Sequence, residues 1–255
     1  ATLREYQNKG FNWLWFLYSY GLNGVLADDM GLGKTLQALA LIQKAKDKEG
    51  KKPTLVICPT SVVFNWEDEI AKFTPNLSVL NLTGSERYDS YKHIDKTDII
   101  ITSYALVRRD INLLKKYDFR LIILDESQNI KNYESITAQS VKQLNSDHRL
   151  ALSGTPVENR LSELWSVFDY LMPGFLYDLS EFNYKFATPI MDRQDKTVES
   201  RLKKQIYPFI LRRMKRDVAK DLPDKLENIA YCKMTPKQED FYTDFLMHTR
   251  ETLLK

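Results

Sequence analysis

The 255-residue sequence predicts an α/β fold in three layers, with a mostly parallel central sheet and a helical addition toward its C-terminal end. Two observations favour this class. Short β-branched apolar runs alternate with amphipathic stretches of helix length, which implies right-handed crossovers in a layered domain. The runs are also continuously apolar, as at residues 121–124. Strands that are buried on both faces of a parallel sheet have this pattern.

The expected elements follow this alternation along the chain. Strands are predicted at residues 24–27, 55–58, 79–82, 99–102, 121–125 and 150–153. Helices are predicted between them at residues 34–46, 62–73, 104–116 and 135–144. We expect these elements to form one domain at residues 1–160.

The pattern changes after Pro156. Helical periodicity continues to the break at Pro173-Gly174, and aromatic-rich helical segments follow it. The apolar positions of the first helix are Leu161, Leu164, Trp165, Phe168 and Leu171. We expect a helical insertion at 161–217, packed on the first domain, and a linker from 218 to 255. Because the sequence does not begin with Met, we expect an excerpt of a longer protein.

Composition excludes several classes. Hydrophobic residues make up 43% and charged residues 28%, which excludes collagen-like, low-complexity and generally disordered chains. No apolar run reaches the ~20 residues that span a bilayer, so no membrane partner is expected. Two cysteines and three scattered histidines predict neither a disulfide framework nor a zinc site, and favour a reducing compartment. The net charge of +3 excludes nothing by itself.

A glycine-rich segment follows the first strand and opens a helix. It reads Asp-Asp-Met-Gly-Leu-Gly-Lys-Thr at residues 28–35. The backbone N–H groups of such a turn can bind phosphates, Lys34 can reach the β- and γ-phosphates, and the Thr35 hydroxyl can bind Mg²⁺. Asp28 stands where other phosphate loops have Gly. The alternative is a structural turn with a surface lysine. The candidate cofactor-binding residues are Asp29, Met30, Gly31, Leu32, Gly33, Lys34 and Thr35.

Two further strand ends carry polar residues. Asp125 and Glu126 follow an apolar strand, where one acid can bind Mg²⁺ and the other can deprotonate the attacking water. Ser153, Gly154 and Thr155 follow the last predicted strand of the domain. Taken separately, each pattern is also typical of a helix start. Because ligands bind beyond the carboxyl ends of parallel strands, the three patterns together predict a nucleoside-triphosphate site.

These segments resemble the Swi/Snf-type DNA-translocating ATPases of helicase superfamily two. Asp28–Thr35 has that family's form of the phosphate loop, with the acid at Asp28, and Asp125-Glu126-Ser127-Gln128 departs only at Ser127. The resemblance implies that Gln7 contacts adenine and that Gln128 belongs with Lys34, Asp125 and Glu126 to the catalytic group. It implies that Ser153, Gly154 and Thr155 couple hydrolysis to DNA. The implied DNA contacts are Thr60, Asn65, Thr102, Ser103 and Arg160, with Arg212 and Arg213 as further candidates.

The resemblance also implies the fold and the activity. Residues 1–160 would be the first RecA-like lobe of an Mg-ATP-dependent motor on double-stranded DNA. A second RecA-like lobe in the same protein, absent from this chain, would supply an arginine finger, and DNA-bound proteins are possible substrates. The expected location is the cytoplasm or nucleoid of a prokaryote, which is favoured, or a nucleus. The alternatives are a related restriction or repair translocase and a non-catalytic DNA- or partner-binding scaffold. Trp66 could contact DNA or pack its helix.

Overall fold

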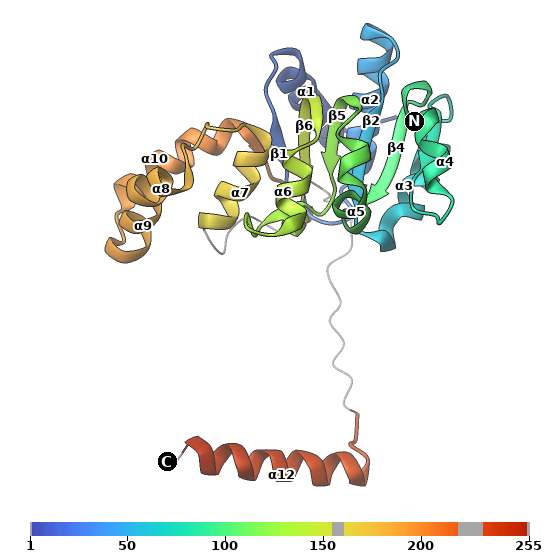
Figure 1. The fold of residues 1–255 in the computed structure, drawn as a ribbon. Coiled ribbons are helices and arrows are strands. Elements are labelled where there is room, and N and C mark those ends of the chain that lie inside the picture. Colours follow the sequence, from blue (N-terminus) through green and yellow to red (C-terminus); the bar gives the residue numbers. More distant parts are fainter. Residues whose placement is uncertain (1, 155–160, 219–231, 254–255) are drawn as a thin grey trace. The chain divides into compact units, whose positions relative to one another are not determined.

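The computed structural model describes residues 2–154, 161–218 and 232–253. The chain divides into two compact units, Ala1–Ala219 and Lys220–Lys255. Both units are drawn in Figure 1.

The first unit is built on a seven-stranded sheet in which the strands run parallel, in the order β3-β4-β2-β5-β6-β1-β7. The three-layer fold with a parallel sheet is confirmed. The strands are β1 (Gly24–Leu26), β2 (Thr54–Cys58), β3 (Val79–Asn81), β4 (Ile99–Ser103), β5 (Asp118–Leu124), β6 (Asn145–Leu152) and β7 (Ile210–Leu211). The sequence predicted six of them and missed β7.

Helices cover both faces of this sheet (Figure 1). On one face lie α1 (Glu5–Ser19), α2 (Lys34–Glu49) and α3 (Val63–Phe73); on the other lie α4 (Arg87–Ser90), α5 (Tyr104–Leu114), α6 (Ile136–Lys142) and α7 (Leu161–Leu171). Alternate strand residues enter the two cores. Val56 belongs to the hydrophobic core that contains Ile70 of α3. Its neighbour Leu55 belongs to the core on the other face, which contains Val107 of α5.

The helical part that follows has a core of its own. It contains α8 (Leu179–Phe182), a π-helical turn at Asn183–Ala187, α9 (Thr188–Arg193) and α10 (Lys196–Ile206). Helix α7 joins this core to the sheet, since Trp165 and Phe168 pack among the later helices while Tyr170 packs in the sheet core.

The segment predicted as a helical insertion at 161–217 is not helical throughout. After α10 the chain returns to the sheet, and β7 pairs in parallel with β1. A strand of two residues has no periodicity that a sequence pattern could reveal. A short helix, α11 (Lys215–Val218), follows it. The strand β6 is also longer than expected, because its polar first half pairs with β5 from Asn145 onward. Within that half the Arg149 guanidinium donates to the carbonyls of Tyr170 and Leu144.

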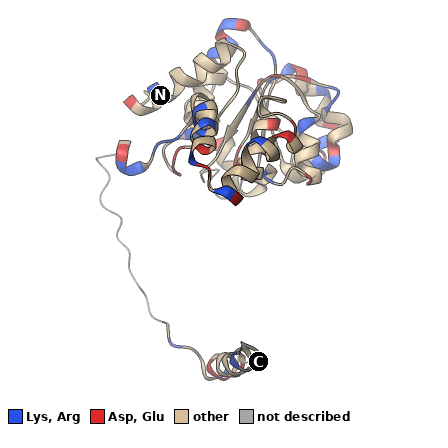
Figure 2. Cartoon of the chain, turned by 90° about the vertical axis from the view of Figure 1, so that its left-hand side faces the viewer, with Lys and Arg blue, Asp and Glu red and all other residues tan. Residues whose placement is uncertain are grey.

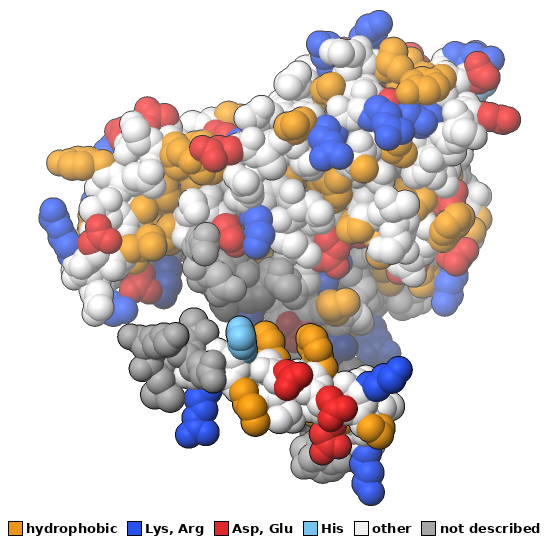
Figure 3. Space-filling model, turned by 60° about the horizontal axis from the view of Figure 1, so that its bottom comes forward, with side chains coloured by type: hydrophobic (Ala, Val, Ile, Leu, Met, Phe, Trp, Pro, Cys, Tyr) orange, Lys and Arg blue, Asp and Glu red, His pale blue; other side chains and the backbone are white. Residues whose placement is uncertain are grey.

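The second unit contains α12 (Pro236–Leu253). Gln238 caps its start, because the backbone N–H and hydroxyl of Thr235 donate to the Gln238 amide oxygen. Large apolar side chains on this helix are exposed to solvent (Figure 3). They are Phe241, Tyr242, Phe245, Leu246 and Met247.

Charged residues of both signs are distributed over the first unit (Figure 2). Among the helices that the structure describes, none is long and apolar enough to cross a bilayer.

Candidate nucleotide-binding site

The loop between β1 and α2 is shaped by two glycines. Gly31 has φ +83° and Gly33 has φ +76°, a left-handed conformation that residues with a Cβ rarely adopt. Gly33 is the N-cap of the 16-residue helix α2 and forms no side-chain cap. The first N–H groups of α2 and the positive end of its dipole therefore face the loop, an arrangement that suits a phosphate.

Lys34 is the first residue of α2, and its ammonium folds back on the loop. Its Nζ donates to the carbonyl oxygens of Asp28, at 2.7 Å, and Asp29, at 3.4 Å. Burial lowers the pKa of Lys34, although Glu126 and Asp125 act to raise it. An anion bound in the loop would stabilise this desolvated charge.

Asp125 directly follows β5 and is held by several groups. Its Oδ2 accepts a hydrogen bond from Trp66 Nε1 at 2.8 Å, and its Oδ1 accepts one from the Glu126 N–H at 2.9 Å. The Tyr104 hydroxyl donates to the Asp125 carbonyl at 2.7 Å. Burial raises the pKa of the Asp125 carboxyl, against the hydrogen bond from Trp66. Trp66 is fully buried, so it packs its helix and orients Asp125.

Glu126 is held in an uncommon backbone conformation, with φ +50°. Such a conformation in a residue other than glycine stores strain and persists where the surroundings determine it. Gln128 Nε2 donates to Glu126 Oε2 at 2.8 Å, and Ser153 Oγ donates to Gln128 Oε1 at 3.5 Å. Gln128 therefore connects the acidic pair to the end of β6.

The end of β6 also meets the glycine-containing loop between β1 and α2. A Cβ on Gly154 would lie 3.0 Å from Met30 Cγ and 3.8 Å from Lys34 Nζ, so the absence of a side chain allows this approach. The Ser153 N–H donates to the carbonyl of Leu26 in β1. The structure thus brings together the three strand ends that the sequence predicted. Thr155 lies outside the described residues.

Gln7 lies on α1 beside the same loop. Its Nε2 donates to the Leu32 carbonyl at 3.3 Å, and its Oε1 accepts from the Arg4 N–H at 2.9 Å. Thr35 is half-buried in the first turn of α2. The predicted cofactor residues, Gln7 and residues 29–35, therefore lie together at the loop between β1 and α2.

The predicted DNA contacts fall into two groups. Thr60 and Asn65 are exposed, at the start of the segment that leads into α3 and on α3 itself. Thr102 and Ser103 are each only 2% exposed, and Ser103 Oγ caps α5 by accepting from Leu106 N–H. Their burial leaves no side-chain surface for DNA in this arrangement. Arg160 lies outside the described residues.

Three contributors were not found from the sequence. Trp66 was an open question, Tyr104 was placed only in a DNA-side segment, and Arg213 was expected at DNA. The Arg213 guanidinium instead forms a buried ion pair with Asp28, so that expectation is wrong for this arrangement. The unusual acid in the loop was the available signal, because a buried carboxylate needs a cationic partner. Burial raises the pKa of the Cys58 thiol to about 12.

Comparison with known proteins decides the family. The model of the SNF2-related domain matches residues 6–255. The chain belongs to the SNF2-related domain family. A solved SWI2/SNF2 ATPase core of Sulfolobus solfataricus, in complex with dsDNA, superposes with a TM-score of 0.82 at 46% identity. The match covers 95% of this chain and 51% of that chain. The RecA-like fold and the resemblance to Swi/Snf ATPases are thereby confirmed.

Curated relatives of this SNF2-related chain are much longer proteins. TATA-binding protein-associated factor MOT1 of Saccharomyces cerevisiae is 40% identical over 280 residues, which cover 100% of this chain and 15% of MOT1. Helicase SWR1 of Kluyveromyces lactis is 41% identical over 282 residues, covering 99% of this chain and 18% of SWR1. The chain therefore spans less than a fifth of either relative.

Proposed function

We propose that this chain is the Mg-ATP-binding lobe of an ATPase that translocates along double-stranded DNA and moves DNA or DNA-bound proteins. The observation that carries the proposal is the meeting of Lys34, the pair Asp125–Glu126 and Gly154 at the carboxyl edge of one parallel sheet. This arrangement supports the proposal because an ATPase needs a phosphate-binding cation and a group that activates water within one site.

Each part of the site has a role in this proposal. The N–H groups at the start of α2 and the Lys34 ammonium hold the phosphates. Thr35 and Asp125 hold Mg²⁺, which neutralises charge on the phosphates when bound. Mg²⁺ usually takes one or two carboxylates besides water and phosphate oxygens. The described residues contain no cluster of three His, Cys, Asp or Glu side chains that could hold a metal ion. The proposed Mg²⁺ site does not require such a cluster, because Asp125 supplies its one carboxylate. The nucleotide's adenine lies at Gln7.

Glu126 accepts a proton from the attacking water, and Gln128 orients Glu126. A non-catalytic scaffold would have no use for the strained backbone of Glu126 or for the desolvated ammonium of Lys34, because both disfavour the folded state. These two features favour an enzyme over a scaffold. Ser153 and Gly154 would transmit a structural change at the γ-phosphate to the rest of the lobe.

Two observations support the proposed partners. The archaeal relative was solved with dsDNA, and Thr60 and Asn65 of this chain are exposed on the segment that follows β2. The apolar side chains on α12 form a surface that is typical of a protein contact. We assign that contact to a second RecA-like lobe in the same protein, which would also supply an arginine finger. Nucleic acid as partner implies action in a nucleoid or nucleus.

Steady-state ATP hydrolysis tests this proposal, measured for this chain and for the complete protein, each with saturating duplex DNA. An arginine finger contributes roughly 10³–10⁵ in rate. We therefore expect DNA-stimulated turnover in the complete protein and turnover lower by about that factor in this chain. Equal DNA-stimulated rates would show that this chain holds a complete active site. Absence of turnover in the complete protein would overturn the proposed activity.

A further inference from the structure

The segment that leaves the helical part runs along the phosphate loop. Ala27 N–H donates to the Leu211 carbonyl at 2.7 Å, and Asp29 N–H donates to the Arg213 carbonyl at 3.0 Å. The Lys215 N–H then donates to Asp29 Oδ2 at 2.9 Å. Residues 211–215 therefore extend the β7–β1 pairing past the strand ends and line one side of the loop. Nearly two hundred residues of sequence separate the two segments.

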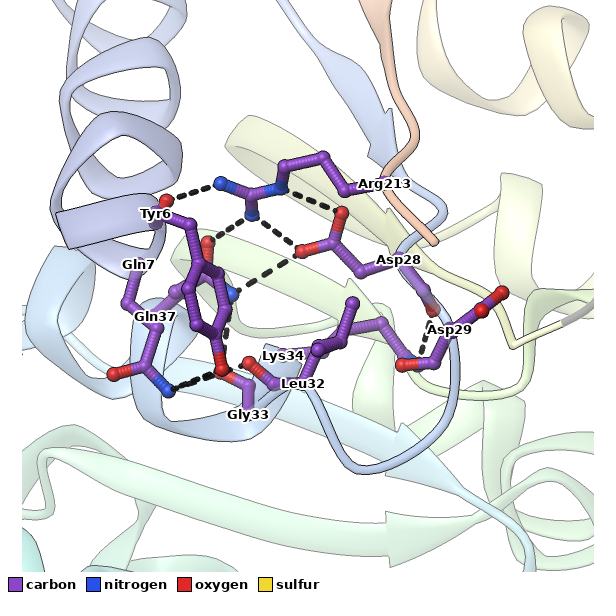
Figure 4. Close-up of polar contacts among 9 residues, drawn as sticks. All are labelled: Tyr6, Gln7, Asp28, Asp29, Leu32, Gly33, Lys34, Gln37 and Arg213. Carbon is purple, nitrogen blue, oxygen red and sulfur yellow. Dashed lines mark hydrogen bonds and ion pairs between the residues drawn. The ribbon is translucent and has the colours of Figure 1, made fainter. Parts of the chain in front are cut away.

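Arg213 adds a side-chain connection to these backbone bonds (Figure 4). Its Nε donates to Asp28 Oδ1 at 2.9 Å, and its Nη2 donates to Asp28 Oδ2. Asp28 is 0% exposed and the Arg213 side chain 13% exposed, so the pair is largely removed from water. A two-pronged Arg–carboxylate contact fixes geometry as well as charge.

The same guanidinium reaches two more elements. Its Nη2 also donates to Gln37 Oε1 at 2.7 Å, and Gln37 Nε2 donates to the Gly33 carbonyl at 3.2 Å. Its Nη1 donates to the Tyr6 carbonyl, directly before Gln7 (Figure 4). Arg213 thus contacts the start of the loop directly, reaches its end at Gly33 through Gln37, and contacts the start of the helix that carries Gln7.

Helix α1 makes room for this arrangement at Gly10. A Cβ there would lie 1.9 Å from Gln37 Oε1 and 2.7 Å from Arg213 Nη2, which no structure could accommodate without moving them. Glycine inside a helix destabilises it by roughly 0.5–1 kcal/mol relative to alanine. Gly10 lies within α1, where that penalty applies, and the approach of Gln37 and Arg213 explains why a side chain is absent.

We propose that Arg213 is a positioning residue for the nucleotide: it holds the phosphate loop and the Gln7 helix in one arrangement and ties both to the path of residues 211–215. This inference rests on the proposed ATP site. Arg213 acts through Asp28, Gln37 and Tyr6 rather than on the nucleotide itself. By linkage, nucleotide binding and the path of residues 211–215 favour each other.

Kinetics of the complete protein test this role, with saturating duplex DNA and at a temperature where circular dichroism shows every variant folded. Arg213→Lys keeps the charge but loses the fork. We expect it to raise the KM for ATP about tenfold, the effect of losing one charged hydrogen bond, and to leave kcat within about twofold. Gly10→Ala should raise the KM in the same direction. Arg193→Met removes an exposed arginine of α9 and should change neither constant.

A double variant distinguishes a positioning role of Arg213 from a purely stabilising one. Arg213→Met alone leaves the Asp28 carboxylate buried and unpaired, which lowers the melting temperature. Adding Asp28→Asn removes that charge, so the double variant should recover melting temperature while its KM stays raised, because the loop is still not held. Recovery of KM together with melting temperature would overturn the proposal. An unchanged KM in Arg213→Lys would also overturn it.

Lys34→Ala serves as the reference in the same assays. If Lys34→Ala loses ATP turnover while Arg213→Lys keeps the wild-type KM, only the role of Arg213 is wrong. If Lys34→Ala matches the wild type, the proposed ATP site is itself wrong.

Discussion

The charged side chains at the two edges of the sheet have different partners. At the amino edge, where β2, β4, β5 and β6 begin, charges are paired: Lys46 with Asp98 at 3.0 Å, Arg120 with Glu49 at 2.6 Å and Lys52 with Asp147 at 2.6 Å. At the carboxyl edge Asp28 is paired with Arg213, but Lys34 bonds to main-chain carbonyls, and the described residues give it no ion pair. Paired charges suit stability, whereas an available cation suits an anionic ligand.

The carboxyl groups of the two edges show the same contrast. Burial acts to raise the pKa of Asp98, but hydrogen bonds from Ser78 and the Lys46 ammonium lower it on balance. The stabilisation from Asp98 is therefore present above its ordinary pKa and is lost as the pH falls through the lowered value. The pKa of Asp125 is raised, so stability falls as the pH rises from its ordinary value through the raised one. At the carboxyl edge, burial disfavours the charged forms of Asp125 and Lys34, which is typical of a functional site.

The largest expected effect is at the carboxyl edge. Glu126→Gln should reduce ATP turnover in the complete protein by about 10²–10⁴-fold while nucleotide binding is retained, because proton transfer matters in the transition state. Turnover and equilibrium binding are measured for this variant and for Glu86→Gln, an exposed glutamate that should leave both unchanged. Normal turnover with lost binding would show that Glu126 and Asp125 have been assigned each other's roles.

A substitution at the amino edge should instead lower stability and leave the KM for ATP unchanged. Arg120 is buried and donates to the Glu49 carboxylate and to the carbonyls of Ala45 and Gly50. Arg120→Met should lower the free energy of unfolding by about 2–3 kcal/mol, since it leaves these acceptors without a donor. The KM for ATP should not change. Urea denaturation gives the first quantity and ATPase kinetics the second.

Lys9→Met is the control for Arg120→Met, since Lys9 belongs to an exposed pair with Glu5. Exposed pairs contribute little to stability, so Lys9→Met should leave the free energy of unfolding nearly unchanged. A raised KM in Arg120→Met would remove the functional distinction between the edges.

A smaller effect concerns the pH dependence of turnover. Trp66 donates to the Asp125 carboxylate, which favours the ionised form. Trp66→Phe should therefore raise the pKa of Asp125 further and move the acid limb of the kcat/KM profile to higher pH, with the plateau little changed. The profile is recorded at fixed Mg²⁺ concentration. An acid limb that stays in place, or moves to lower pH, would contradict the assignment of Asp125 to the metal.

Local sequence was sufficient to predict the glycine-containing turn between β1 and α2 and most of the sheet. Lys34 follows Gly33 directly, and the strands carry continuous apolar runs, so short-range patterns reveal both. Contacts between distant residues were beyond such patterns. Trp66 and Asp125 are 59 positions apart, and Arg213 and Asp28 are 185 apart. Only the folded sheet brings these groups together.

The sequence predicted the burial of side chains less well than the positions of the strands. Thr102 and Ser103 were expected at DNA because the segment that contains them resembles a DNA-side motif of the Swi/Snf-type ATPases. The strand β4 continues through Ser103 and is covered on both faces, so these side chains are buried. Exposure at a strand end depends on where the neighbouring strands stop, which one strand's sequence does not show.

In the proposed function, Lys34 binds a nucleoside triphosphate at the carboxyl edge of the sheet. Calorimetric titration of Mg-ATP into this chain tests it most directly, for the wild type, Lys34→Ala and Lys52→Ala, a lysine of the amino edge. We expect the wild type and Lys52→Ala to bind with equal affinity, and Lys34→Ala to bind about 100-fold more weakly, since it loses charged hydrogen bonds to the phosphates. Equal affinity in the wild type and Lys34→Ala would contradict the claim.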